Sequence, residues 1–226
     1  MSKNILVTGA GRGIGFELCK QLADAGHKVF ALSRNLQKIS KLHHTNITAV
    51  SFDLSSDKSF DTLQGILKDL KKIDILINNA GWLVHKPFEQ LSQADFQQSY
   101  EVNVFGPIRL IQLVLPYMPK DGHVVNISSM GGIQGSVKFG GLAAYSSAKA
   151  ALINLTELLA EEYKESGPSF NVLALGAVQT EMLAQAFPGY QAPISAPEMA
   201  SYIAQFAVSG NVFYNGKILQ VSSSTP

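Results

Sequence analysis

The chain has 226 residues, with 18 Lys and Arg against 17 Asp and Glu, five His and one Cys. That length suits one domain with a sizeable core, and a formal net charge of +1 leaves no basic surface for nucleic acid or an anionic membrane. The single Cys excludes an intramolecular disulfide and a zinc site built from cysteines, and is typical of a reducing compartment. No apolar run approaches the roughly 18 residues of a membrane span, and no signal-peptide pattern is present. We expect a cytoplasmic globular protein with one domain, residues 1–226.

Short apolar runs alternate with longer amphipathic stretches along the chain. Most runs are continuously apolar, as in strands buried on both faces of a parallel sheet. Strands are predicted over residues 4–7, 28–32, 47–52, 74–77, 123–127, 170–175 and 217–221. Helices are predicted over residues 13–25, 56–72, 92–118, 142–166 and 196–208, the third either kinked at Pro107 or divided into two, and the polar tail 222–226 is expected to fray. This order predicts a single-domain, Rossmann-type doubly wound α/β sheet of about seven parallel strands with helices on both faces.

A glycine-rich turn follows the first predicted strand. Gly9, Gly13 and Gly15 have the spacing G-x-x-x-G-x-G, and Ile14 stands where the pattern G-x-G-x-x-G would need its third glycine. Glycines let the backbone turn tightly and approach a pyrophosphate, which binds the free N–H groups of a helix N-terminus. A plain tight turn is the alternative, but the position between the first strand and the first helix favours a nucleotide site.

The end of the second predicted strand is where the two nicotinamide dinucleotides are distinguished. An acidic residue there binds the 2′-hydroxyl of NAD, whereas a nearby Arg accommodates the 2′-phosphate of NADP. This chain has Ser33 and Arg34 and no acid, and Arg12 of the glycine turn could reach the same phosphate. The alternative is that Arg34 is an ordinary surface residue of a turn. We predict NADP(H) in preference to NAD(H).

Three polar segments, residues 78–81, 126–129 and 145–149, lie at strand ends or soon after, where open α/β sheets bind ligands. Tyr145 and Lys149 are four residues apart and share one helix face. An ammonium about 4 Å from a phenol stabilises the phenolate by about 4 kcal/mol at an effective dielectric of 20. We therefore expect a lowered pKa for Tyr145, which would suit a general acid or base. Taken alone, a Tyr-x-x-x-Lys pair is usually a helix surface pair.

In chain order, these segments resemble the motifs of the short-chain dehydrogenase/reductase family in its ordinary short form, and the resemblance covers essentially the whole chain. Residues 8–15 match the family's T-G-x-x-x-G-x-G, and residues 78–81 match its N-N-A-G. Asn103 matches its helix asparagine, Ser129 its catalytic serine, and residues 145–149 its Y-x-x-x-K.

The resemblance implies hydride transfer between a nicotinamide and a carbonyl or alcohol carbon, with no metal taking part. Tyr145 would supply or take the hydroxyl proton, and Ser129 would polarise the oxygen. Lys149 would lower the pKa of the tyrosine and bind the nicotinamide ribose, and Asn103 would hold a water of the proton relay. Ser129 is preferred to Ser128 because it stands directly before a loop of small residues.

The resemblance also implies a cofactor site assembled from several strand ends. Asp53 with Leu54 matches the adenine-binding position, with a helix-capping Asp as the alternative. Thr180 matches the residue that binds the nicotinamide carboxamide, with an ordinary N-cap as the alternative. The expected cofactor-binding residues are Gly9, Arg12, Gly13, Ile14, Gly15, Ser33, Arg34, Asp53, Leu54, Asn79, Ala80, Gly81, Tyr145, Lys149, Val178 and Thr180.

Two segments depart from the family pattern. Residues 180–197 are shorter than the usual substrate-binding segment, which predicts an open pocket, and residues 134–141 form a slightly long, glycine-containing stretch, which predicts a mobile loop at the mouth. His85 is either a ligand or a surface loop residue. The candidate pocket residues are Trp82, Leu83, Val84, Met130, Ile133, Leu183, Phe187 and Tyr190.

The leading hypothesis is an NADPH-dependent carbonyl reductase whose substrate is a small or lipophilic carbonyl or alcohol. A catalytically silent NADP(H)-binding regulator or sensor is the alternative, which the short segment after Thr180 favours. A sugar-nucleotide epimerase is disfavoured because a C-terminal substrate domain is absent. The family often assembles through the helices predicted at 92–118 and 142–166, so a homodimer or homotetramer is expected, with no nucleic-acid or membrane partner.

Overall fold

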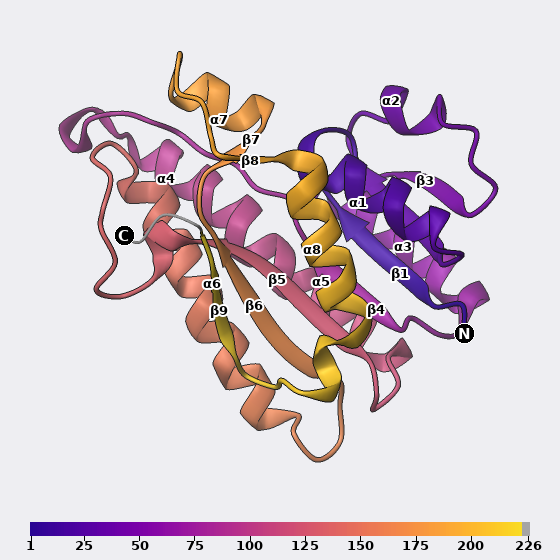
Figure 1. The fold of residues 1–226 in the computed structure, drawn as a ribbon. Helices are drawn as coiled ribbons and strands as arrows, with labels where there is room; N and C mark the ends of the chain where they lie inside the picture. Colours follow the sequence, from indigo (N-terminus) through magenta and orange to yellow (C-terminus); the bar gives the residue numbers. More distant parts are fainter. Residues whose placement is uncertain (223–226) are drawn as a thin grey trace.

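Seven parallel strands form one sheet in the order β3-β2-β1-β4-β5-β6-β9 (Figure 1). The computed structural model describes residues 1–222. Residues 223–226 of the predicted domain lie outside the described part, and they make up most of the tail 222–226 that was expected to fray. The chain steps outward from β1 to β3 and then returns to add β4 on the other side of β1, which places a topological switch point between β1 and β4. The strands are β1 (Asn4–Thr8), β2 (Lys28–Ser33), β3 (Ile47–Ser51), β4 (Ile75–Asn78), β5 (His123–Ser129), β6 (Ser169–Leu175) and β9 (Ile218–Val221).

Helices cover both faces of this sheet, as the apolar strands require. In β1, Ile5 and Val7 pack with α1 and α8 on one face, whereas Leu6 packs with α3, α5 and α6 on the other. Successive side chains of a strand point to opposite faces, so a strand covered on both sides is continuously apolar. The predicted doubly wound α/β fold is confirmed. The helices are α1 (Gly13–Asp24), α3 (Asp57–Leu70), α5 (Gly106–Val114), α6 (Ala143–Glu162) and α8 (Ala196–Ser209).

The helix predicted over residues 92–118 is one helical stretch with a wider turn inside it. α4 (Gln93–Tyr100) passes into a π-helical turn, Glu101–Phe105, and then into α5. Pro107 has no N–H to donate to the carbonyl of Asn103, four residues earlier. The N–H of Gly106 instead donates to the carbonyl of Glu101, five residues earlier. Such π turns occur often at functional sites, and this one carries Asn103.

Several short elements were not predicted, because segments of two to six residues show no measurable periodicity. Most lie at the carboxyl end of the sheet, where the candidate site is. They are α2 (Gln37–Ser40), β7 (Val178–Gln179), α7 (Glu181–Ala186) and β8 (Ile194–Ser195), with 3₁₀ turns at Phe88–Gln90, Met130–Gly132 and Gly210–Val212. A further 3₁₀ turn, Leu115–Tyr117, lies inside the helix predicted over residues 92–118.

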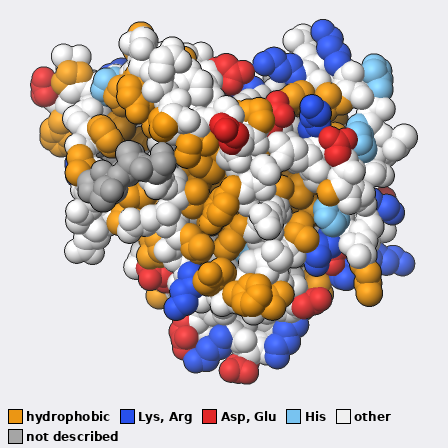
Figure 2. Space-filling model, viewed as in Figure 1, with side chains coloured by type: hydrophobic (Ala, Val, Ile, Leu, Met, Phe, Trp, Pro, Cys, Tyr) orange, Lys and Arg blue, Asp and Glu red, His pale blue; other side chains and the backbone are white. Residues whose placement is uncertain are grey.

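The surface is mixed in character (Figure 2). Apolar side chains gather on the face shown, over α8 and the edge strand β9. The exposed large apolar residues of α8, β9 and the segment between them are Tyr202, Val212, Phe213, Tyr214 and Ile218.

Within residues 1–222, no helix combines the length and apolar composition needed to span a bilayer.

Candidate active site

The turn between β1 and α1 has a backbone that needs glycine. Gly9 and Gly13 are left-handed, with φ of +71° and +54°. A Cβ on Gly15 would lie 2.3 Å from the carbonyl oxygen of Gly9, so the helix begins directly against the turn. No side chain caps the first turn of α1, whose N-cap is Arg12. Its N–H groups and the positive end of its dipole therefore form a cradle that fits a pyrophosphate.

The segment after β4 is bonded to this turn. Thr8 Oγ1 accepts hydrogen bonds from the N–H groups of Asn79 (3.0 Å) and Ala80 (2.9 Å). Asn79 Nδ2 donates in return to the carbonyl of Thr8 (2.9 Å). A Cβ on Gly9 would lie 2.9 Å from the Cα of Ala80. Because β1 and β4 are neighbours in the sheet, two motifs about seventy residues apart in sequence form one surface.

The end of β2 borders the same turn. A Cβ on Gly11 would lie 2.6 Å from Ser33 Oγ, which accepts a hydrogen bond from the N–H of Asn35. Arg12 and Arg34 are exposed, and neither guanidinium makes a hydrogen bond or ion pair with any residue of the described chain. Arg34 is therefore available to an anionic ligand, whereas Arg12 also attracts the carboxylate of Glu181 and helps to lower the pKa of that group.

The residues matched to the adenine position have local roles in the structure. Asp53 Oδ1 accepts from the N–H of Ser55 (3.0 Å) within the turn that precedes α3. Leu54 is buried, and a Cβ on Gly106 would lie 2.8 Å from its Cβ. Asp53 does not cap α3, whose N-cap is Ser56, so the helix-capping alternative is not realised, and the contact of Asp53 with adenine stays a prediction.

β5 carries two adjacent serines to the carboxyl edge of the sheet. Ser128 is buried and its hydroxyl donates to the backbone carbonyl of Lys149 (2.9 Å). Ser129 points to the other side, as alternation along a strand requires. Its Oγ accepts from the N–H of Gly131 (3.3 Å), and its hydroxyl is hydrogen-bonded to Tyr145. This geometry favours Ser129 over Ser128 as the serine beside the tyrosine.

Tyr145 and Lys149 project from α6, and their electrostatics differ from the expectation. Burial raises the pKa of Tyr145 to about 12, opposed only by the hydrogen bond with Ser129. Burial lowers the pKa of Lys149 to about 8. Lys149 Nζ donates to the carbonyl of Ile127 (2.9 Å) and lies 5.7 Å from the ring centroid of Tyr145. The expected lowering of the tyrosine pKa by Lys149 is therefore wrong for this structure: burial raises the pKa, and the ammonium of Lys149 binds the carbonyl of Ile127.

Asn103 is buried on the π turn and holds the loop that follows Gly81. Its Nδ2 donates to the carbonyls of Trp82 (2.8 Å) and Ser99 (2.9 Å), and its Oδ1 accepts from the N–H of Trp82 (3.3 Å). A Cβ on Gly81 would lie 3.3 Å from Asn103 Oδ1 and 3.7 Å from Lys149 Nζ. The side chains of Asn103 and Lys149 thus both lie close to Gly81, which has no side chain to separate them.

The segment after β6 returns to the glycine turn. Val178 is buried in β7, and Thr180 is the N-cap of α7, with Oγ1 accepting from the N–H of Leu183 (3.2 Å). A Cβ on Gly13 would lie 3.5 Å from Thr180 Cγ2 and 3.5 Å from a carboxylate oxygen of Glu181. The N-cap alternative for Thr180 is thus realised, next to the glycine turn, and its contact with the nicotinamide carboxamide stays a prediction. An open groove of about 470 Å³ runs alongside, lined by Gly13, Phe16, Glu17, Lys38, Gln179, Thr180, Glu181, Ala184 and Ala196.

The sequence left His85 as either a ligand or a surface loop residue, and in the structure it joins two separate segments. No sequence pattern predicts such a contact. Its Nδ1 lies 2.9 Å from the carbonyl oxygen of Ala186 at the end of α7, and its Nε2 lies 3.2 Å from that of Gly140. Its ring packs 4.7 Å from that of Phe187. The loop over 133–142 is thereby tied to α7 across the mouth of the site.

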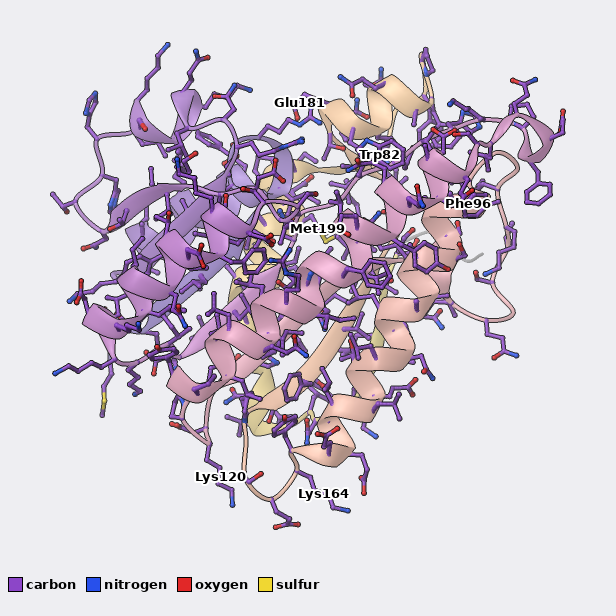
Figure 3. All side chains as sticks on the ribbon, turned by 180° about the vertical axis from the view of Figure 1, so that it is seen from behind. Trp82, Phe96, Lys120, Lys164, Glu181 and Met199 are labelled. Carbon is purple, nitrogen blue, oxygen red and sulfur yellow. The ribbon has the colours of Figure 1, made fainter. Side chains whose placement is uncertain are left out.

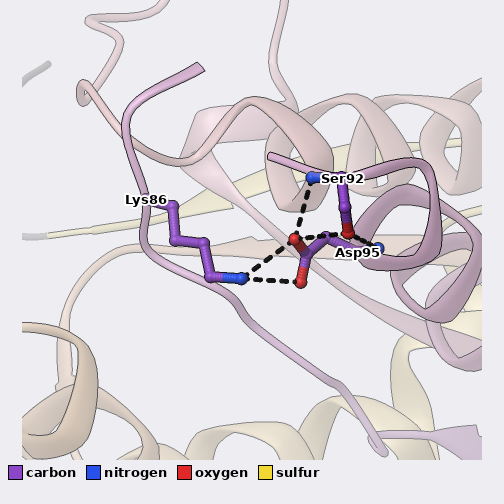
Figure 4. A network of polar contacts seen from close by, with 3 residues as sticks. All are labelled: Lys86, Ser92 and Asp95. Atoms are coloured by element: carbon purple, nitrogen blue, oxygen red, sulfur yellow. Dashed lines mark hydrogen bonds and ion pairs between the residues drawn. The ribbon is translucent and has the colours of Figure 1, made fainter. Parts of the chain in front are cut away.

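Lys86 fastens the same segment to α4. Its ammonium donates to both carboxylate oxygens of Asp95, at 3.0 and 2.9 Å, and Asp95 forms a capping box with Ser92 (Figure 4). The N–H of Lys86 donates to the carbonyl of Gly141 (3.0 Å). Among the candidate pocket residues, Met130 is buried and Tyr190 is exposed. The half-buried ones are Trp82, Leu83, Val84, Ile133, Leu183 and Phe187.

The structure places a dinucleotide-type glycine turn and a Ser-Tyr-Lys group together at the carboxyl edge of a parallel sheet. These features indicate a dinucleotide-dependent oxidoreductase as the class of protein. Comparison with known proteins agrees: the sequence profile of the short chain dehydrogenases matches residues 3–191. The 7alpha-hydroxysteroid dehydrogenase of Escherichia coli (strain K12) is 34% identical over 80% of this chain and 73% of its own length. The fatty acyl-CoA reductase of Acinetobacter baylyi is 30% identical over 91% of this chain and 72% of its own. The chain belongs to the short-chain dehydrogenase/reductase family.

Other similar proteins extend this picture. The 3-amino-tetrahydro-pyrrolizinone reductase of Xenorhabdus hominickii is 35% identical over 79% of this chain, and the match spans 62% of that protein's length. A solved 4-hydroxyisoleucine dehydrogenase complexed with NADH has a TM-score of 0.88 at 26% identity, covering 99% of this chain and 98% of its own. ElxO with NADP bound has a TM-score of 0.84 at 26% identity, covering 98% of both chains. A nicotinamide cofactor is thus common to both solved relatives.

Proposed function

We propose that the protein is an NADPH-dependent oxidoreductase that transfers a hydride between the nicotinamide and a small or lipophilic carbonyl or alcohol. The observation that carries this proposal is the hydrogen bond between Ser129 and Tyr145 beside the buried Lys149. Similar proteins named as dehydrogenases and reductases support it. The bare glycine cradle at the start of α1 supports a dinucleotide cofactor, because it offers backbone donors where side chains are absent.

The polar groups divide the work of a carbonyl reduction. A bound nicotinamide cofactor supplies the hydride. Tyr145, whose pKa is raised, is protonated at neutral pH and donates its proton to the carbonyl oxygen. The hydroxyl of Ser129 donates a hydrogen bond to the same oxygen. Lys149 is charged below about pH 8 and stabilises the phenolate that remains.

The reductase proposal is tested by NADPH oxidation against aldehydes, ketones, quinones and diketones, with a steroid ketone and an acyl-CoA thioester added because two similar proteins bear those names. We expect Tyr145→Phe to lower kcat by about 10²–10⁴-fold, because it removes the general acid. The dissociation constant for NADPH should stay within about two-fold, since the ring is retained. Tyr202→Phe, on an exposed tyrosine of α8 that is not among the candidate pocket residues, is the control and should keep full activity.

Two outcomes would contradict the reductase proposal. Turnover retained in Tyr145→Phe would remove the tyrosine from the chemistry. NADPH binding by the wild-type protein without turnover of any carbonyl would support the alternative, a silent regulator or sensor.

We propose NADP(H) in preference to NAD(H) because Arg34 directly follows β2, where no acid stands, and because Arg12 belongs to the glycine turn that packs against Ser33. A guanidinium binds phosphate through its fork of donors. Arg34→Ala is expected to lower kcat/KM for NADPH by about ten-fold or more while leaving that for NADH unchanged. Steady-state kinetics with both cofactors measure this, and an equal loss for both would show that Arg34 does not select the cofactor.

A further inference from the structure

The loop over 133–142 returns an exposed lysine to the turn that follows Ser129. Lys138 Nζ donates to the carbonyls of Gly131 (2.9 Å) and Ile133 and to Ser136 Oγ (3.0 Å). An ammonium has three N–H donors, so all of them have partners. Within residues 1–222 no carboxylate pairs with Lys138. The ammonium of Lys138 therefore binds backbone carbonyls and a serine hydroxyl, and not an acidic side chain.

A series of hydrogen bonds leads from this ammonium to Ser129. Ser136 accepts from Lys138, and its hydroxyl hydrogen is shared between the carbonyl of Met130 (2.6 Å) and the more distant carbonyl of Ile133 (2.9 Å). The carbonyl of Met130 and the N–H of Gly131 belong to the same peptide group, and this N–H donates to Ser129 Oγ (3.3 Å). Hydrogen bonds in series polarise one another, so the cation makes the Gly131 N–H a stronger donor. Lys138 and Ser129 thus hold opposite ends of one short turn.

The turn has no room to shift without disturbing the site. Its residues, Met130–Gly132, are buried against α6, which carries Tyr145 and Lys149. A Cβ on Gly131 would lie 2.7 Å from Ser146 Oγ, and a Cβ on Gly132 would lie 2.8 Å from the backbone carbon of Lys149. Any movement of the turn would therefore change the position of Ser129 relative to the tyrosine.

We propose that Lys138 is a positioning residue for the reaction, holding the turn after β5 so that the hydroxyl of Ser129 stays opposite Tyr145. The inference rests on the proposed function, which gives Ser129 the substrate oxygen. The hydrogen bonds of the Lys138 ammonium go to Gly131, Ile133 and Ser136 and not to the glycine turn, so we expect its effect on the chemical step and not on cofactor binding.

The test compares three variants of the intact protein. Lys138→Met keeps the length of the side chain and removes its donors, whereas Lys138→Arg restores charge and donors. Lys164→Met is the matched control, because Lys120 and Lys164 lie at the opposite end of the molecule from Trp82 and Glu181 (Figure 3). With NADPH and the best carbonyl of the panel, we expect Lys138→Met to lower kcat about ten-fold, since small misplacements of a catalytic group have large effects on rate. KM and the NADPH dissociation constant should stay within about two-fold, Lys138→Arg should recover most of the rate, and the control should match the wild type.

Amide hydrogen exchange at Gly131 is the second readout and needs no substrate. We expect this N–H to exchange about five-fold faster in Lys138→Met, at unchanged melting temperature, because one polarising partner is lost. Unchanged exchange together with unchanged kcat would overturn the proposal, as would a fall in NADPH affinity equal to the fall in kcat. Absent turnover in the wild type would refute the proposed function itself, whereas Gly131 exchange would still decide whether Lys138 holds the turn.

Discussion

Buried polar residues occur at both ends of the sheet, and His123 at the amino end is hydrogen-bonded to other parts of the chain. His123 at the start of β5 is buried, with Nδ1 2.9 Å from the carbonyl oxygen of Ala207 and Nε2 3.0 Å from Asn171 Nδ2. Since a carbonyl only accepts and an amide nitrogen only donates, His123 carries its proton on Nδ1 and is neutral. Burial lowers its pKa to about 4.

His123 makes stability depend on pH. The unfolded chain takes up this proton near pH 6.5, whereas the folded protein does so only near pH 4, so the unfolded state holds more protons between these values. The stabilisation is complete above pH 6.5 and is lost as the pH falls through the window, by about 3 kcal/mol in all. Urea unfolding at several pH values measures this. His123→Gln should flatten the dependence, and the control His43→Asn, at an exposed histidine with φ of +46°, should keep it. An unchanged slope in His123→Gln would assign the effect to other groups.

Among the elements, α1 and α3 each contain a glycine inside the helix, and the two have opposite surroundings. Gly15 of α1 is pressed against the glycine turn, since its Cβ would also lie 2.5 Å from Asn79 Nδ2. Gly65 of α3 has no atom within 4 Å of its Cβ position. Helix propensity favours alanine at both positions equally, so any difference between the two substitutions reports packing.

We therefore predict opposite effects for a matched pair of substitutions. Gly65→Ala should stabilise the protein by about 0.5–1 kcal/mol and leave cofactor binding unchanged. Gly15→Ala should destabilise it by about 1–3 kcal/mol through overpacking and should weaken NADPH binding by at least about ten-fold. Denaturant unfolding and fluorescence titration with NADPH measure both quantities. Normal NADPH affinity in Gly15→Ala would show that the turn does not form the cofactor site.

At the scale of the whole molecule, the helices expected to join copies of the chain expose large apolar side chains. Leu158 on α6 is 60% exposed, and Phe105 on the π turn is 48% exposed. Light scattering after gel filtration should give the mass of a dimer or tetramer, and Leu158→Asp should shift it toward the monomer by placing a charge in an apolar contact. Phe213→Asp, over α8 and β9, is the control for a general effect of added charge. A monomeric wild type would contradict the expected assembly.

Local sequence was sufficient for the regular elements and for much of the site. The continuous apolar runs and intervening amphipathic stretches located seven strands and the long helices, because burial on both faces of a sheet requires that pattern. The positive φ of Gly9 and Gly13 and the capping box of Ser92 follow from chemistry within a few residues. Likewise, helical spacing alone placed Tyr145 and Lys149 on one face of α6.

Tertiary structure decided which groups those side chains meet. Lys149 binds a strand carbonyl and the pKa of Tyr145 rises, an outcome that depends on the desolvation produced by several packed elements and not on the four-residue spacing. Asn103 holds the backbone of Trp82, and Lys138 the turn after Ser129, through contacts that no periodic pattern encodes. Periodicity reports how a residue faces its own element, whereas charge state and hydrogen-bond partners depend on which elements are brought against it.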